Sequence, residues 1–196
     1  MGKVITISRQ FGSGGRTIGR MVAEKLGIPC YDNEIITQIA EKSGFCEEYI
    51  REKGEYSNTG SKFFNAIGFG YVNGLSLQDR LWIEQEKVIL ELAQKGDCVI
   101  VGRCADFILQ DKVKCVKVFI HTSMKNRIER INKFYNEEET PTERSLEAKD
   151  KRRKAYYQYY TDVEWGLAKN YHLCLDSGEL GVENCANIIS EVYKQE

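Results

Sequence analysis

The residues most suited to chemistry lie near the start of the chain, in the segment 10–17, which reads QFGSGGRT. Three of its residues are glycines, and they are followed by a guanidinium at Arg16 and a hydroxyl at Thr17. Glycines let successive backbone N–H groups turn toward one point, where they can hold an anion. The segment therefore predicts a phosphate-binding loop in which Arg16 and Thr17 are the two functional side chains.

The elements on either side of this loop would have to position it. The β-branched apolar run 4–7 is typical of a buried strand, and apolar residues at 18, 21, 22 and 26 recur at helical spacing. Gly27 supplies a stop for that helix. A strand, a glycine loop and a helix together aim unpaired N–H groups and the positive end of the helix dipole at a phosphate.

The loop resembles a P-loop with two departures. Laid on residues 10–17, the pattern G-x-x-x-x-G-K-[ST] matches at Gly15 and Thr17, while Gln10 and Arg16 stand where glycine and lysine are expected. Arg16 can still hold a β- or γ-phosphate with its forked head. Thr17 is placed to bind Mg²⁺.

Two other interpretations of this segment stay open. One is an ordinary flexible turn without a ligand. The other is a dinucleotide-binding turn, since Asp32 follows the glycines by about 20 residues, where an acidic side chain would hold a ribose. The glycine pattern of that motif requires a glycine at position 17, where this chain has threonine.

Composition limits the classes of protein that need to be considered. The chain has 196 residues, 29% of them charged, and a net charge of −1, so one domain is expected and a general affinity for nucleic acid is not. Its seven cysteines form no C-x-x-C pair and its two histidines are isolated, which argues against zinc sites and a disulfide framework. No signal peptide or membrane-spanning run is evident, so we expect a cytoplasmic protein.

Along the rest of the chain, predicted strands alternate with predicted helices. Strands are expected at 28–31, 98–101, 113–120 and 171–175, and helices at 34–42, 76–95, 105–110 and from 124 and 182 onward. We expect Asn33 to cap the helix after it, Thr140 and Glu143 to form a capping box, and 176–178 to be a turn. A ligand-covering loop is expected at 56–74. The alternation implies a parallel sheet with helices on both faces.

With these elements placed, the chain resembles the cytidylate kinase-like family of P-loop nucleoside monophosphate kinases. The resemblance is carried by SRQFGSGGRTIG, IVGRCADFIL, DKRRKAYYQYYTDVEWG and NYHLCLDSGELG. It implies a P-loop NTPase fold: a three-layer α/β/α domain over 1–196 with a five-stranded parallel sheet. It also implies a helical insert at about 33–75 that binds the acceptor monophosphate, and a basic lid at 133–165.

The resemblance also implies roles for single residues. ATP would be bound by Gly12, Ser13, Gly14, Gly15, Arg16, Thr17, Ile18, Ser177 and Gly178, with Thr17 on Mg²⁺. The acceptor would be bound by Asp32, Arg103, Asp150 and Arg153. Charge on the transferring phosphoryl group would be balanced by Arg16, Arg103, Arg127, Arg130, Arg152 and Arg153, with Arg127 and Arg130 expected on the surface of their helix. The competing interpretations are a surface ion pair for Arg103 and a solvated helix face for the basic run 149–154.

The sequence thus predicts ATP- and Mg²⁺-dependent phosphoryl transfer to a nucleoside monophosphate, with CMP or dCMP as the favoured acceptor. The family's arginine shortly after Asp32 is missing, and Gln38 is nearest in register, so a different small-molecule acceptor is the first alternative. A nucleotide-binding regulatory protein with weak or no turnover is the second, and a dehydrogenase is the third. Expected partners are small nucleotides, with no nucleic-acid polymer and no membrane.

Overall fold

A computed structural model of the chain describes residues 2–47, 49–50, 71–72, 75–134 and 141–195. Most of the predicted loop 56–74, part of the predicted insert 33–75, and Thr140 lie outside the described residues. Within the region of the predicted loop, β3 (Tyr71–Val72) pairs antiparallel with β4 (Leu75–Ser76).

The centre of the molecule is a parallel sheet of five strands in the order β2-β5-β1-β6-β7. Its strands are β1 (Val4–Arg9), β2 (Cys30–Tyr31), β5 (Cys98–Val101), β6 (Cys115–His121) and β7 (Leu173–Asp176). Every residue of β1 and β5 is buried, as expected for strands covered on both faces. The predicted five-stranded parallel sheet is therefore confirmed.

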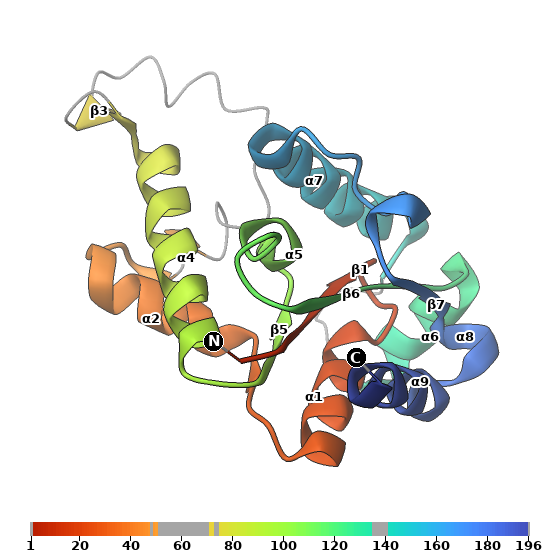
Figure 1. Ribbon diagram of the computed structural model, residues 1–196. Coiled ribbons are helices and arrows are strands. Elements are labelled where there is room, and N and C mark those ends of the chain that lie inside the picture. Colours follow the sequence, from red (N-terminus) through yellow and green to blue (C-terminus); the bar gives the residue numbers. More distant parts are fainter. Residues whose placement is uncertain (1, 48, 51–70, 73–74, 135–140, 196) are drawn as a thin grey trace.

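Helices cover both faces of this sheet, which gives three layers (Figure 1). They are α1 (Gly15–Leu26), α2 (Asn33–Ser43), α4 (Leu77–Gln94), α5 (Ala105–Ile108), α6 (Met124–Phe134), α7 (Glu143–Thr161), α8 (Ser177–Leu180) and α9 (Val182–Gln195), with a 3-10 turn at Ala168–Asn170. α1 and α9 pack against one face, and α2, α4, α5 and part of α7 pack against the other.

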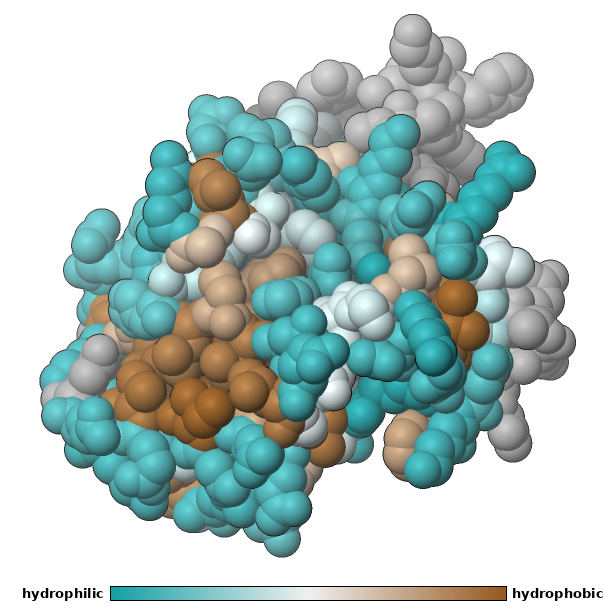
Figure 2. Space-filling view, turned by 90° about the vertical axis from the view of Figure 1, so that its right-hand side faces the viewer, coloured by the Kyte–Doolittle hydropathy of each residue, from teal (hydrophilic) through white to brown (hydrophobic). Residues whose placement is uncertain are grey.

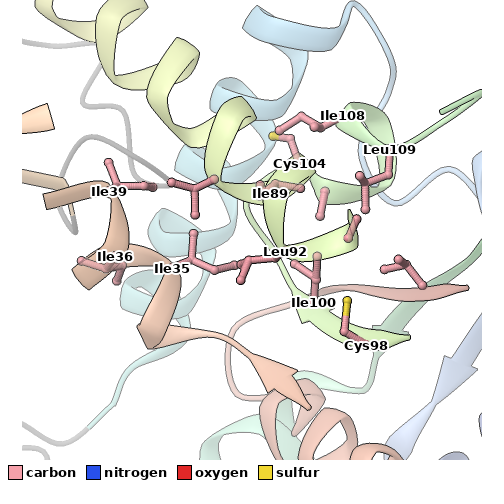
Figure 3. Packing of buried hydrophobic residues seen from close by; sticks show 14 of the residues in the cluster. Ile35, Ile36, Ile39, Ile89, Leu92, Cys98, Ile100, Cys104, Ile108 and Leu109 are labelled. Carbon is pink, nitrogen blue, oxygen red and sulfur yellow. The ribbon is translucent and has the colours of Figure 1, made fainter. Parts of the chain in front are cut away.

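The hydrophobic core is divided between the two faces by the alternation of side chains along each strand. In β5, Val99 and Val101 join the cluster under α1 and α9, whereas Cys98 and Ile100 join the cluster under α2 and α4. Figure 3 shows the second cluster, in which isoleucines of α2 meet Ile89 of α4 and the residues of β5. Both faces of the central strands are thus held by apolar contacts, and the sheet is a rigid base for the loops at its ends.

The caps of two helices differ from the predictions. α2 begins at Asn33 with Asp32 at the cap position, so Asn33 is helical and is not the cap. The capping box of α7 is formed by Thr142 and Ser145, which exchange side-chain to backbone hydrogen bonds of 3.1 and 3.0 Å. The predicted box between Thr140 and Glu143 was wrong because a serine three residues after Thr142 can reciprocate as well as a glutamate.

The predicted turn at 176–178 is the start of a helix. The Asp176 carboxylate accepts hydrogen bonds from the N–H groups of Gly178 and Glu179, at 2.9 and 3.3 Å, and so caps α8. Aspartate is among the residues most favoured as a helix N-cap, but the sequence analysis predicted a turn here and not a capped helix.

The face of the molecule seen in Figure 2, on the side that carries β7, α8 and α9, is mostly hydrophilic. It shows a broad hydrophobic area at the lower left and several smaller ones among hydrophilic atoms. Across the described residues, no helix combines the length and apolar character needed to cross a membrane.

Candidate active site

Several predicted functional residues lie at the carboxyl edge of the sheet, together with Arg9, which was not predicted. Arg9 ends β1, Asp32 follows β2, Arg103 follows β5, and Ser177 follows β7. Because all five strands are parallel, their carboxyl ends lie along the same edge, which is where open α/β sheets bind ligands. Residues up to 168 positions apart in the sequence therefore share one site (9 to 177).

The glycine loop has the backbone that its sequence predicts. Gly12 and Gly14 take left-handed conformations, with φ of 79° and 84°, and α1 starts at Gly15. The N-terminus of α1 has no side-chain cap and no acidic residue in its first turn. The first N–H groups of the helix and its positive dipole end thus remain available to an anion.

Each of the loop glycines is also required by a close neighbour. A Cβ at Gly12 would lie 2.9 Å from Ile131 Cδ1, and one at Gly14 would lie 2.9 Å from the guanidinium of Arg130. A Cβ at Gly15 would lie 2.7 and 2.8 Å from Cβ and Cγ of Arg9. The loop is therefore closely packed on α6 and on the end of β1.

Hydrogen bonds fix the loop to the neighbouring strands. The Ser13 hydroxyl donates to the carbonyls of Gln10 and Ile120, at 2.9 and 3.2 Å. The Ser177 hydroxyl donates to the carbonyl of Ser13 at 2.6 Å. The backbone N–H of Thr122 donates to the side chain of Gln10 at 3.2 Å. Ser13 and Ser177, both predicted to bind ATP, are thus engaged in holding the loop in place.

Gly178 lies where α8 meets α6, beside the loop that Ser177 fastens. A Cβ at this position would lie 2.1 Å from Asn126 Nδ2 and 2.2 Å from Thr122 Oγ1. A side chain at position 178 would therefore displace Asn126 or Thr122. Its predicted contact with ATP remains a prediction.

Arg16 and Asp32, predicted to serve different substrates, contact each other. Arg16 Nε lies 2.8 Å from Asp32 Oδ2, with exposed side-chain fractions of 42% and 9%. That oxygen nevertheless has no hydrogen-bond partner, so the contact is a charge pair without a well-directed N–H bond. The Arg16 head is thus drawn toward the end of β2.

Arg130 and Thr17 form a second contact beside the loop. Arg130 Nη2 donates to the Thr17 hydroxyl at 2.9 Å, and the guanidinium also lies 5.2 Å from the centre of the Phe134 ring. Arg130 is half-buried, and its head lies against Gly14. The structure therefore brings Arg130 to the loop, and its contact with phosphate remains a prediction.

Arg127 is buried, so its predicted position on the surface of α6 was wrong. Only 4% of the residue is exposed. Its Nε donates to the carbonyl of Phe11 at 2.6 Å and its Nη2 to Asp150 Oδ2 at 2.5 Å. A guanidinium is tolerated inside the protein because an adjacent carboxylate balances its charge and its N–H groups find acceptors. The sequence of α6 contains no sign of this partner, which comes from α7.

Asp150 joins α6 and α7 to the start of the loop. Its Oδ1 accepts the backbone N–H of Phe11 at 2.7 Å and lies 3.8 Å from Arg153 Nη1. Burial raises the pKa of Asp150, while the Phe11 N–H and the guanidinium of Arg127 lower it. In this structure the carboxylate therefore positions the loop.

Phe11 is a site residue that the sequence reasoning missed. The Lys149 ammonium lies 3.8 Å from the centre of its ring and the Arg153 guanidinium 5.5 Å from it. Such cation–π contacts attach the loop to α7. A large aromatic side chain inside a glycine-rich turn was the only available signal.

Arg103 occupies a strained turn directly after β5. Gly102, Arg103 and Cys104 all have positive φ, of 78°, 59° and 53°. Two consecutive non-glycine residues in this region cost about 1–3 kcal/mol each, and such strain is concentrated at functional sites. Gln85 of α4, which is fully buried, holds the turn by donating from Nε2 to the Arg103 carbonyl at 3.0 Å.

The side chain of Arg103 faces inward. Its Nη1 donates to the carbonyl of Ile50 at 3.3 Å, and only 5% of the residue is exposed. The alternative interpretation of Arg103 as a surface ion pair is therefore excluded by its burial.

The basic run 149–154 of α7 is divided between two environments. Arg153 is buried and donates from Nη1 to the carbonyl of Arg9 at 3.0 Å. Lys151, Arg152 and Lys154 are exposed. Arg152 is therefore not brought together with the other predicted arginines, and the solvated-face interpretation holds for that side of the helix only.

Two pockets adjoin at this edge of the sheet. The loop pocket is lined by residues including Arg9, Phe11, Gly14, Gly15, Arg16 and Arg153. The strand-end pocket is lined by residues including Arg9, Arg103, Arg153, Tyr156, Tyr157 and Trp165. Arg9 and Arg153 line both pockets.

The charge of these pockets indicates the kind of ligand. Among the described residues that line them, none is acidic. Arg9, Arg103 and Arg153 are 5–6% exposed, and Arg153 Nη1 also lies 3.8 Å from Asp150 Oδ1. Guanidinium groups donate readily to phosphate oxygens, so both pockets are suited to phosphate groups.

Comparisons with known proteins agree with this arrangement. Residues 4–179 match the sequence profile of the cytidylate kinase-like family. Cytidylate kinase from Archaeoglobus fulgidus is 27% identical over 190 residues, which cover 94% of this chain and 91% of that protein. These matches support the assignment of the chain to the nucleotide-binding phosphotransferases.

Solved structures share the fold. An uncharacterized protein from Eubacterium ventriosum superposes with a TM-score of 0.72 at 24% identity, covering 99% of both chains. A shikimate kinase from Acinetobacter baumannii in complex with shikimate superposes with a TM-score of 0.55 at 16% identity, covering 100% of this chain and 94% of that one. The predicted P-loop kinase fold is confirmed, and on its sequence match the chain belongs to the cytidylate kinase-like family.

Proposed function

We propose that the protein transfers the γ-phosphoryl group of ATP to a nucleoside monophosphate, with CMP or dCMP as the favoured acceptor. The observation that carries the proposal is the pair of adjoining pockets joined by Arg9 and Arg153. A nucleoside monophosphate kinase must hold two phosphate-bearing substrates end to end, and two adjoining pockets that share buried arginines suit that task.

The donor would occupy the loop pocket. Backbone N–H groups of the segment 14–17, at the N-terminus of α1, would bind its phosphates, with Arg16 and Arg130 at the rim. The N–H groups of Ser13 and Ile18, by contrast, donate to the carbonyls of Gln10 and Gly14. Ser177 and Gly178 would support the loop from the β7 side. This arrangement supplies many donors to phosphate oxygens without a covalent nucleophile, which is what phosphoryl transfer requires.

The acceptor phosphate would occupy the strand-end pocket, held by Arg103 and Arg153. A guanidinium can donate two parallel N–H bonds to a phosphate, which fixes both its position and its orientation. Asp32 and Asp150 each contact a protein arginine in this structure. To contact the acceptor, either carboxylate would therefore have to give up its contact with the protein arginine.

The proposal includes Mg²⁺, which would neutralise charge between the donor phosphates. Thr17 Oγ1 is a suitable oxygen ligand, and Asp32 Oδ2 is a buried oxygen without a hydrogen-bond partner. Arg130 now donates to Thr17, so this guanidinium has to leave the hydroxyl for the ion to reach it. The described residues contain no cluster of three or more metal-ligating side chains.

The direct test is an assay of the purified protein with ATP and Mg²⁺ against a panel of nucleoside monophosphates and shikimate, read by mass spectrometry. CMP or dCMP should give the highest kcat/KM, with ADP and the matching diphosphate as products. Preferential turnover of another acceptor would contradict the choice of cytidine nucleotides. ATP binding without any transfer would favour the alternative of a regulatory protein, for which the contact between Arg130 and Thr17 is the supporting observation.

We also propose that the lid is confined to the first half of α7. Glu143, Arg144 and Glu147 are exposed there, whereas Tyr156 and Tyr157 are buried in the core. Closing over the substrates would keep water from the phosphoryl group. Amide hydrogen exchange should therefore slow at residues 143–150 when ATP and CMP are both present, and stay slow at 154–161 with or without them. Equal protection of both halves in both states would show that α7 is fixed along its whole length.

A further inference from the structure

We propose that Arg9 supplies the phosphate-binding cation that a lysine supplies in an ordinary P-loop, and that Gly15 is glycine to make room for it. This inference rests on the proposed function and adds a residue that the sequence pattern did not identify. Three observations support it: the path of the Arg9 side chain, its position between the two pockets, and the position of Arg16.

The path of the side chain is recorded by its contacts with Gly15. A Cβ on Gly15 would lie 2.7, 2.8 and 3.6 Å from Cβ, Cγ and Cδ of Arg9. The stem of Arg9 thus crosses the first residue of α1, in the space that a side chain at position 15 would fill. Gly15 has no positive φ, so its backbone does not require glycine, and the close approach of Arg9 is the remaining reason for it.

The position of Arg9 suits a group that acts on phosphate. It lines the loop pocket together with Gly12, Gly14 and Gly15, and it also lines the strand-end pocket together with Arg103. Only 5% of the residue is exposed. A cation at the junction of the two pockets is placed where the phosphoryl group passes from donor to acceptor, and where its charge is least screened by water.

The backbone of Arg9 is fixed. Arg9 lies opposite Ile120 in the parallel pairing of β1 with β6, and its carbonyl accepts Arg153 Nη1 at 3.0 Å. Because the cation is attached to a fixed central strand, binding phosphate costs little conformational entropy at this residue.

Arg16, the residue that pattern matching selects, is turned toward Asp32 at 2.8 Å. Moving the P-loop pattern back by one residue places Gly14 at its second glycine, Gly15 at the lysine position and Arg16 at the hydroxyl position. In that register α1 begins at the lysine position, which is occupied by Gly15. The space that a lysine side chain would fill there is taken by the stem of Arg9 from the preceding strand.

A rescue experiment tests this replacement. Arg9→Gly removes the cation, Gly15→Lys introduces a lysine that collides with the Arg9 stem, and the double variant restores one cation in the same space. We expect each single variant to lower kcat/KM for ATP by about a hundredfold, as for the loss of one charge-stabilising donor, and the double variant to recover about tenfold or more. ATP affinity, measured by calorimetry, should follow the same order.

Two further variants separate charge from folding. Arg9→Met keeps a stem of similar length without the charge and should lose ATP affinity about as much as Arg9→Gly, while Arg9→Lys should lose less. Arg20→Met is the matched control, because it removes an exposed arginine from α1 outside both pockets. Melting temperatures of all variants identify any that fail to fold.

The outcomes distinguish this inference from the proposed function. If the unmodified protein neither binds ATP nor transfers its phosphate, the proposed function is wrong and the inference falls with it. If the unmodified protein is active and Arg9→Met is no worse than Arg20→Met, the proposed function stands and Arg9 has no part in binding phosphate. Failure of the double variant to exceed both single variants would reject the replacement of lysine by Arg9.

Discussion

Arg103→Lys is expected to lower kcat/KM for the acceptor by about a hundredfold, because lysine keeps the charge but loses the forked pair of N–H donors. The residue is buried at the strand-end pocket, and Gln85 holds its strained backbone in place. The turn therefore cannot move to restore the hydrogen bond to the acceptor phosphate that lysine fails to make. ATP affinity should be essentially unchanged, since Arg103 lines the strand-end pocket and not the loop pocket. Initial rates at varied acceptor concentration, with ATP saturating, are the measurement.

The matched control is Arg20→Lys, the same change at an exposed position of α1 outside both pockets. It should leave both kinetic constants as they are, since exposed charges contribute little. A fall in ATP affinity with an unchanged acceptor KM in Arg103→Lys would mean that donor and acceptor have been assigned to the wrong pockets.

Asp150→Ala is expected to have the largest effect on stability, about 3–5 kcal/mol, the usual cost of removing one partner of a buried ion pair. The change would leave Arg127, which is 4% exposed, without its carboxylate and the Phe11 N–H without its acceptor. For a chain of this size the melting temperature should fall by roughly 6–20 °C. Thermal unfolding followed by circular dichroism would measure it.

Two comparisons show whether the charge is the cause. Glu147→Ala changes an exposed carboxylate one turn earlier on α7 and should be nearly neutral. Adding Arg127→Met to Asp150→Ala removes the unbalanced guanidinium and should recover part of the lost stability. If Asp150→Ala unfolds at the same temperature as the Glu147→Ala control, the pair with Arg127 contributes nothing to folding.

The sequence alone was sufficient for the sheet and for the location of the site. β-branched apolar runs mark strands buried on both faces, and the run at 98–101 coincides with β5. Gly27 ends α1 as predicted, and the helix predicted from residue 76 is α4, which Ser76 caps. These features depend only on neighbours within a few residues, so they can be predicted from the sequence alone. The parallel alternation then places Asp32, Arg103 and the glycine loop at one edge of the sheet.

The environment of each charged residue was decided by the tertiary structure. Arg127 and Arg152 look alike in the sequence, yet one is buried against Asp150 and the other is exposed. Their surroundings come from other helices, over separations that no local pattern spans, as with Phe11 and Asp150, which are 139 residues apart.

The same reason explains why Arg9 was overlooked. At the end of β1 it is one more basic residue in the sequence, and the pattern directs attention to Arg16. Only the folded chain shows the Arg9 stem lying across Gly15 and the Arg16 head beside Asp32. The course of the backbone is encoded in the local spacing of apolar residues. Which cation reaches a phosphate depends instead on steric room and on the nearest opposite charge. Both are set only when distant segments of the chain pack together.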